Sequence, residues 1–190
     1  MTRARDLASR GGLTQIIPTS ITVAAGSGTV SANGGVTFTG TTSVLLNNCF
    51  SSAYDNYKIV ISNLASSAGN LLSYQMSSAG TAVGTSTYSH QRHYTQGTSV
   101  GGERTGPTTS SSLSYVSTGA LNSVSFEIIN PFLSTVTKTT SIGNYSDPTF
   151  PYYIDIFNGY HSTAASYDGI RIFSASTISG TIRIYGYNNG

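Results

Sequence analysis

Charged residues are scarce in this 190-residue sequence. Asp, Glu, Lys and Arg make up 8% of it, against about 25% in ordinary globular proteins. Proteins usually keep exposed sheet edges apart with charge, above all with lysine, and this chain has only Lys58 and Lys138. A surface with so few ions repels its neighbours weakly, so we expect partners to cover it and the protein to be an oligomer.

Cysteine is nearly absent, and long apolar runs are missing. The single Cys49 excludes an intrachain disulfide. It lies in the apolar run 44–50, which favours a buried small side chain over a reactive thiol. The apolar stretch of about 7–15 residues that marks a signal peptide does not follow Arg3 and Arg5. No segment approaches the about 20 apolar residues of a membrane span, so we expect no membrane partner.

The net charge is concentrated at the N-terminus. Arg3, Arg5 and Arg10 stand against one acid, Asp6, and the resulting charge of +2 equals that of the whole chain. We expect the three arginines and Leu7 to anchor this segment on a partner protein with acidic grooves. Three arginines are few for phosphate contacts, and the rest of the chain is neutral, so we do not expect nucleic acid as the partner.

The chain divides into three parts on this pattern. Residues 1–17 form an anchoring arm, residues 18–40 a connector with strand potential, and residues 41–190 a β module. Within the arm, Thr2 as an N-cap and Gly11-Gly12 as a stop predict a short helix over 2–10. A helix of barely two turns is marginal on its own, so the arm must dock to be ordered.

Alternating apolar and polar residues predict strands throughout the β module. In the last segment of this kind, Tyr152, Ile154 and Ile156 are expected to form the apolar row. A turn over 174–180 separates the last two strands, and residues 97–112 predict a long exposed loop. About eight to ten strands favour an all-β fold, a two-sheet antiparallel sandwich of jelly-roll type. The clearest alternating segments are 57–61, 72–76, 124–128 and 152–156.

Side chains for chemistry are sparse. His90 and His93 are three residues apart on an expected strand, so they point to opposite faces and cannot easily share a metal ion. Glycoside hydrolysis needs two carboxylates about 5–9 Å apart. Glu127 and Asp155 instead face away from their own apolar rows, where pairing with Arg171 or Arg183 explains them. We therefore predict no enzyme activity, no metal site and no cofactor.

Tyrosine is abundant, with 13 residues, while tryptophan is absent. Tyr joins a rigid apolar ring to a polar tip, which suits sugar contacts and protein interfaces. Strand propensity and core filling account for the tyrosines equally well. On the first interpretation, the residues expected at an oligomer or ligand contact are Phe132, Phe150, Tyr152, Tyr153 and Tyr160.

Two segments resemble proteins of tailed phages. The opening MTRARDLASRGG resembles the starts of phage structural proteins, cyanophages among them. Residues 167–173 (YDGIRIF) and 180–187 (GTIRIYGY) resemble the last two strands of phage virion β modules. Such modules occur in tail-fibre tips and capsid decoration proteins, commonly as trimers.

The resemblance implies a virion protein made in the host cytoplasm. Its partners would be two further copies in a homotrimer and other virion proteins, either the major capsid protein or a tail adaptor. No coiled-coil heptads or collagen-like stretch supplies a fibre shaft, which favours a capsid cement or decoration protein. The alternative is a tail-fibre or receptor-binding tip that recognises host surface glycan, and a third hypothesis is a depolymerase domain.

Overall fold

The computed structural model describes residues 12–118, 122–146 and 153–188, and within them the chain is all-β. All 14 strands belong to one continuous antiparallel sheet, and these residues contain no helix. The expected all-β antiparallel class is therefore confirmed. The helix expected over 2–10 lies outside the described residues.

The strands follow each other with short connections. In chain order they are β1 (Leu13–Ile16), β2 (Ser20–Val23), β3 (Ser27–Val30), β4 (Val36–Asn47), β5 (Asn56–Ser66), β6 (Asn70–Ser78), β7 (Thr81–Ala82), β8 (Tyr88–Gln96), β9 (Ser99–Thr108), β10 (Ser111–Val116), β11 (Asn122–Ile129), β12 (Thr137–Tyr145), β13 (Tyr153–His161) and β14 (Gly169–Tyr187).

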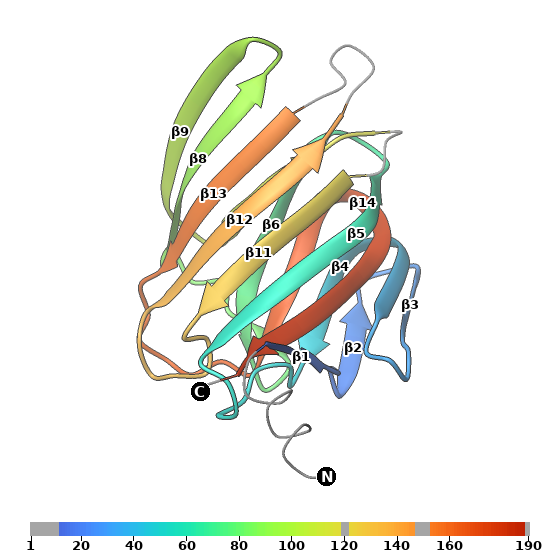
Figure 1. The fold of residues 1–190 in the computed structure, drawn as a ribbon, viewed down its shortest axis with the longest axis vertical. Coiled ribbons are helices and arrows are strands. Elements are labelled where there is room, and N and C mark those ends of the chain that lie inside the picture. Colours follow the sequence, from blue (N-terminus) through green and yellow to red (C-terminus); the bar gives the residue numbers. More distant parts are fainter. Residues whose placement is uncertain (1–11, 119–121, 147–152, 189–190) are drawn as a thin grey trace.

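The sheet bends over so that its two ends pack face to face in two layers (Figure 1). The front layer in Figure 1 runs from β9 through β8, β13, β12, β11 and β5 to the second half of β14. Behind it lie β10, β6 and the first half of β14. β10 packs on β12 and β13 without pairing with either strand. The finer jelly-roll arrangement stays a prediction.

β14 joins the two layers, and the prediction of a turn over residues 174–180 is wrong. Ile172 pairs with Tyr74 of β6 in the rear layer. Ile182 pairs with Ile61 of β5 in the front layer. The register with β4 shifts between Phe173 and Ile178, where the small residues 174–176 let the strand bend from one layer into the other. One bent strand therefore replaces the expected two.

The prediction of a long exposed loop over residues 97–112 is also wrong. Residues 99–108 form β9, which pairs with β8 from Ser99↔Gln96 to Thr108↔Tyr88. β9 is the outermost strand of the front layer, and most of its side chains are exposed. A strand at such an edge needs no apolar row, because its backbone hydrogen bonds to β8 hold it in place. The polar composition of residues 97–112 therefore predicted a loop where the structure has a strand.

The core lies between the layers, and the strands centred on Ile59, Tyr74 and Phe126 bury the expected rows. β4 begins at Val36 and so crosses the division placed between residues 40 and 41. Val36 and its neighbour Phe38 are buried in the same core as the rest.

The alternation expected for β13 is inverted. Asp155 and Phe157 face inward, while Ile154 and Ile156 face out. Gly159 explains the parity: a Cβ there would lie 2.3 Å from Thr139 Oγ1 and 2.7 Å from Ser111 Oγ. The layers approach so closely at this point that only glycine fits inward, and the side chains that alternate with it must point outward.

Candidate functional site

The front layer carries an exposed apolar patch on the side that faces away from β10. We call this side the outer face, and it is turned to the viewer in Figure 1 with no described element over it. Ile142 on β12 lies directly opposite Ile156 on β13. They are 50% and 38% exposed, Ile154 is 47% exposed, and Val100 on β9 is 79% exposed. We call these four residues the apolar patch, and large apolar side chains gathered on one exposed sheet face mark a candidate contact surface.

A shallow hollow of about 290 Å³ lies within the apolar patch. Aliphatic side chains of β9 and β13 line it on either side of β8. Its lining is His93, Tyr94, Thr95, Val100, Ile154 and Ile156. An apolar lining of this kind suits another apolar surface better than a charged ligand.

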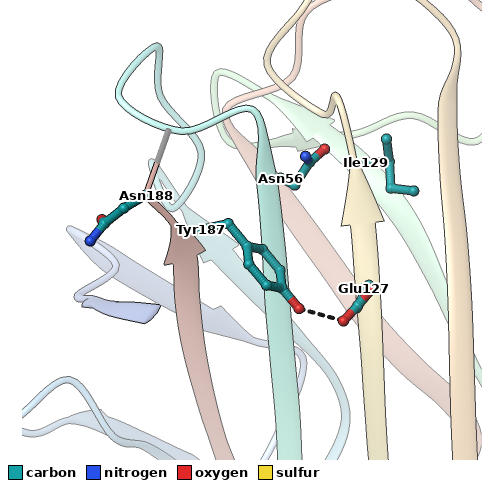
Figure 2. Close-up of a pocket in the computed structure, with 5 residues that line it drawn as sticks. All are labelled: Asn56, Glu127, Ile129, Tyr187 and Asn188. Atoms are coloured by element: carbon teal, nitrogen blue, oxygen red, sulfur yellow. Dashed lines mark hydrogen bonds between the residues drawn. The ribbon is translucent and has the colours of Figure 1, made fainter. Parts of the chain in front are cut away.

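A second hollow of about 410 Å³ lies at the other end of the outer face (Figure 2). Its lining is Asn56, Glu127, Ile129, Tyr187 and Asn188. The Tyr187 hydroxyl donates a hydrogen bond to Glu127 Oε1. Burial and this contact with a carboxylate raise the pKa of Tyr187 to about 12, so its proton stays in place. Glu127 thereby has a defined orientation on the outer face.

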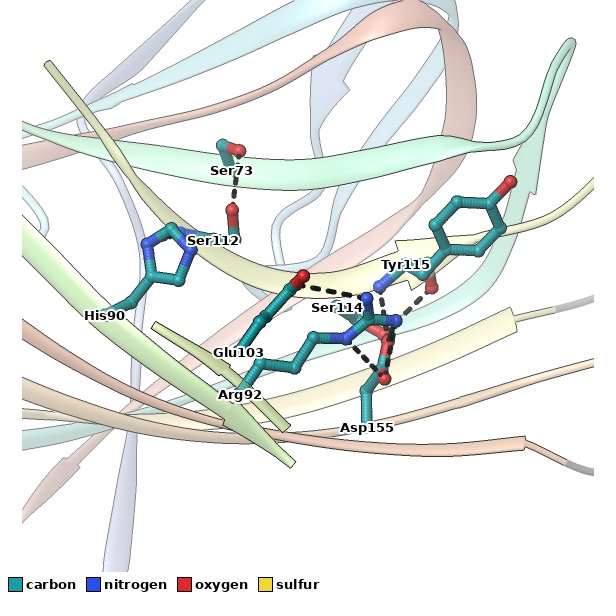
Figure 3. Close-up of polar contacts among 8 residues, drawn as sticks. All are labelled: Ser73, His90, Arg92, Glu103, Ser112, Ser114, Tyr115 and Asp155. Carbon is teal, nitrogen blue, oxygen red and sulfur yellow. Dashed lines mark hydrogen bonds and ion pairs between the residues drawn. The ribbon is translucent and has the colours of Figure 1, made fainter. Parts of the chain in front are cut away.

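The inner side of β8 and β13 holds an ion-pair network (Figure 3). Arg92 Nε donates to Asp155 Oδ1 at 2.9 Å, and Nη2 donates to Oδ2 at 3.0 Å. The backbone N–H of Tyr115 on β10 donates to Asp155 Oδ2 at 2.7 Å. Arg92 Nη1 also lies 3.2 Å from Glu103 Oε1 on β9. The network therefore joins three strands of the front layer to β10 behind them.

Asp155 is fully buried, which corrects the expectation that it is an exposed partner of Arg171 or Arg183. Burial raises the pKa of Asp155, while the Tyr115 N–H and the Arg92 guanidinium favour its ionised form. Both carboxylate oxygens are already bonded. The group is thus a structural ion and is not poised for acid–base chemistry on a substrate.

A buried histidine cluster lies at the opposite end of β13. His161 is 0% exposed and stacks on Tyr88, with 4.1 Å between ring centroids. Its Nε2 lies 2.7 Å from the Tyr167 hydroxyl, and its Nδ1 lies 3.0 Å from Thr87 Oγ1. Burial lowers the pKa of His161 and also that of His90. Both rings are therefore neutral parts of the core.

The structure places only some of the sequence-predicted contact residues. Tyr160 is 40% exposed on the outer face. Phe132 packs against the core, and Tyr153 is buried in a stack with Tyr145. Tyr153 therefore turns inward in this chain. The remaining predicted residues lie outside the described part of the chain: Arg3, Arg5, Leu7, Arg10, Phe150 and Tyr152.

Sequence reasoning missed the apolar patch. β13 has apolar residues on both of its faces: Tyr153 and Phe157 on one, Ile154 and Ile156 on the other. Alternation alone therefore could not show which face of β13 points into the core. The signal that could have done so is Gly159, since an inward glycine in a strand marks close approach of another backbone.

No other site-forming cluster is found in the described ranges. They contain no group of three or more His, Cys, Asp or Glu side chains that could hold a metal ion. His90 is buried and His93 is exposed, which confirms that the two point to opposite faces. In the same ranges, no helix is long and apolar enough to cross a membrane.

Comparisons with known proteins give weak structural similarity alone. No family model matches the chain, and no curated protein matches it. A protein of unknown function from Shewanella oneidensis MR-1 is 11% identical over 94% of this chain and 79% of its own, with a TM-score of 0.25. The CBM2 module of the evolved Dit of Lactobacillus casei BL23 phage J-1 is 9% identical over 94% and 91%, with a TM-score of 0.30. A non-specific endo-β-1,3(4)-glucanase of family GH16 is 9% identical over 95% and 97%, with a TM-score of 0.27. The likeness to these three concerns the all-β fold only.

Proposed function

We propose that this chain is a non-enzymatic virion structural protein of a tailed phage, a cement or decoration protein of the capsid. It attaches through the arm of residues 1–17 and stabilises the shell as a homotrimer of jelly-roll-type sandwiches. The observation that carries this proposal is the separation of charge. The whole net charge of +2 lies in the first ten residues, and the β body is neutral. A neutral body with a cationic attachment segment is suited to a protein that binds as one part of a larger assembly.

A cement protein needs no chemistry, only contacts that exist in the mature shell and are absent in free subunits. Binding to the assembled state alone stabilises that state by mass action. The exposed apolar patch supports this view, because large apolar side chains on a charge-poor surface gain free energy when another protein covers them.

A receptor-binding tip that recognises host glycan is the second candidate. It is favoured by a polar row on the outer face beside Tyr160, which includes Gln91, Asn158 and Thr140. Thr140 Oγ1 donates to Asn158 Oδ1 at 3.2 Å, so this amide is held in place. Planar amides next to an exposed tyrosine ring are suited to sugar hydroxyls and sugar faces.

Deletion of residues 2–12 tests the cement proposal. We expect a folded, soluble protein that no longer binds virions, because the strands begin at Leu13. Replacing Arg3, Arg5 and Arg10 with serine should weaken binding in a salt-sensitive way, since exposed charges are screened within about 8–10 Å at physiological salt.

Virions that lack the protein provide the decisive comparison. On the cement proposal they lose DNA at a lower temperature than complete virions. Equal heat resistance together with lost host adsorption would instead favour the receptor-binding tip. Release of reducing sugar from host polysaccharide would contradict both and support a depolymerase.

A further inference from the structure

We propose that the outer face binds the same face of a second copy of this chain, about a two-fold axis that runs parallel to β13. This contact goes beyond the proposed function and does not depend on whether the protein belongs to the capsid or to the tail. The starting observation is the apolar patch, whose most exposed member, Val100, is 79% exposed. It lies on a broad sheet face that no described element covers (Figure 1).

The strand register arranges the outer face in rows across β9, β8, β13, β12 and β11. One row reads Val100, Thr95, Ile154, Asn144 and Ser123. The next row reads Gly102, His93, Ile156, Ile142 and Ser125. The third row reads Arg104, Gln91, Asn158, Thr140 and Glu127. β13 is the middle strand of all three rows.

A two-fold axis along β13 makes this pattern self-complementary. Each residue of β13 then meets its own copy, so Ile154 and Ile156 stack on the same residues of the partner. Residues of β8 meet residues of β12, which places Ile142 over the partner's His93. The contact is isologous, as two-fold interfaces are, and the isoleucines lie at its centre.

Charge complementarity supports the same axis. Arg104 and Glu127 each lie two strands from β13, on opposite sides and in the same row. The axis therefore places Arg104 of each copy against the partner's Glu127, twice per dimer. Arg104 is exposed and forms none of the ion pairs among the described residues. Lys58 lies beside Glu127 on β5, three strands from β13. No residue of the partner lies opposite it under this axis, because the sheet ends at β9, two strands from β13 on the other side.

The area is sufficient for a stable dimer. Five strands of 8 to 10 residues, about 4.8 Å apart, cover roughly 700 Å². A standard protein interface buries about 800 Å² per partner. Sheets that pack face to face are rotated by about 30°, and the long Arg104 side chain can span the offset that this rotation produces.

Reversing the charges tests the axis directly. We expect Arg104→Glu and Glu127→Arg each to raise the dissociation constant of the dimer at least about tenfold, because like charges then face each other twice. An equimolar mixture of these two variants should form a heterodimer, since both cross-contacts become opposite in charge. The double variant R104E/E127R should dimerise like the wild type. Sedimentation of the four samples measures these constants.

Apolar variants provide the second test. Ile154→Ser should abolish dimerisation, whereas the matched control Leu71→Ser, 36% exposed on β6, should leave it intact. Thermal unfolding checks that both remain folded. A wild-type protein that is monomeric at 100-micromolar concentration (about 10⁻⁴ M, the weak end of specific association) overturns the proposal. So does a trimer whose mass is unaffected by Ile154→Ser. A dimer, or a hexamer made of two paired trimers, supports it.

Discussion

Arg92 and Asp155 face each other from neighbouring strands β8 and β13 and form a two-pronged ion pair in the interior of the sandwich. The carboxylate is 0% exposed, and the arginine side chain is 11% exposed. Removing one member of such a pair leaves an unpaired charge in the core, which typically costs about 3–5 kcal/mol. We expect Arg92→Met and Asp155→Leu each to lower the free energy of unfolding by an amount in this range.

The double variant R92M/D155L is the control for this prediction. Replacing both charges with apolar groups removes the buried ions together, so it should cost clearly less than the sum of the two single changes. Urea unfolding gives the three free energies. Additive costs would show that the two residues act independently, against the contact seen here.

The buried histidines should make the protein sensitive to mild acid. His161 and His90 are held neutral by burial, which lowers their pKa values from the usual 6.5. The unfolded chain takes up these protons below about pH 6.5, and the folded chain takes them up only at lower pH, so the free energy of unfolding falls as the pH falls below that value. The slope is at most about 1.4 kcal/mol per pH unit for each histidine.

His161→Gln and His90→Gln should each flatten this pH profile, because each removes one of the buried rings. Unfolding free energies between pH 7.5 and 4.5 (a window set around the histidine pKa of about 6.5) provide the comparison. A wild-type profile without any loss in this range would be inconsistent with neutral buried rings.

Close packing of the two layers should make Gly143 sensitive to the smallest enlargement. A Cβ there would lie 1.9 Å from Ser114 Oγ and 2.5 Å from Ser114 Cβ. Gly143→Ala should therefore destabilise the protein by about 1–3 kcal/mol, as overpacking does. Gly102→Ala is the matched control, since its nearest neighbour would be 3.5 Å away. Thermal unfolding of both variants checks the difference.

Cys49 should be inert in the folded protein. It is buried, and burial raises the pKa of its thiol, so little thiolate exists near neutral pH. A thiol reagent should label it only after denaturation, with one group per chain. Ser52→Cys, at an exposed position, should react at once under native conditions. Rapid labelling of the native wild type would mean that the region around Cys49 opens.

The sequence predicts the class of this fold because alternation survives wherever one face of a strand is apolar. Tyr57, Ile59 and Ile61 are all buried on β5, as their spacing indicates. The burial expected for Cys49 is confirmed as well. Alternation has no such power on β13, where Ile156 and Phe157 are neighbours and either could face inward.

The candidate site depends on the contacts that alternation cannot reveal. Which side of β13 faces the core is decided by how closely β10 approaches Gly159, a relation between segments far apart in the chain. For the same reason Asp155 reads as an exposed acid in the sequence, although Arg92 binds it in the interior. The polar composition of residues 97–112 likewise hides β9, whose partner strand supplies the order.

The pairing of β1 with the end of β14 has a mechanical consequence. Leu13 lies beside Tyr187, so the first and last described strands leave the molecule side by side. A load that pulls these two ends apart would peel the four residues of β1 from β14 one bond at a time. A load that pulls on Tyr187 along the strand would instead meet β14 in shear, held by β5 and β4 along its length. The module is therefore weak against separation of its own ends and strong against traction on its last strand.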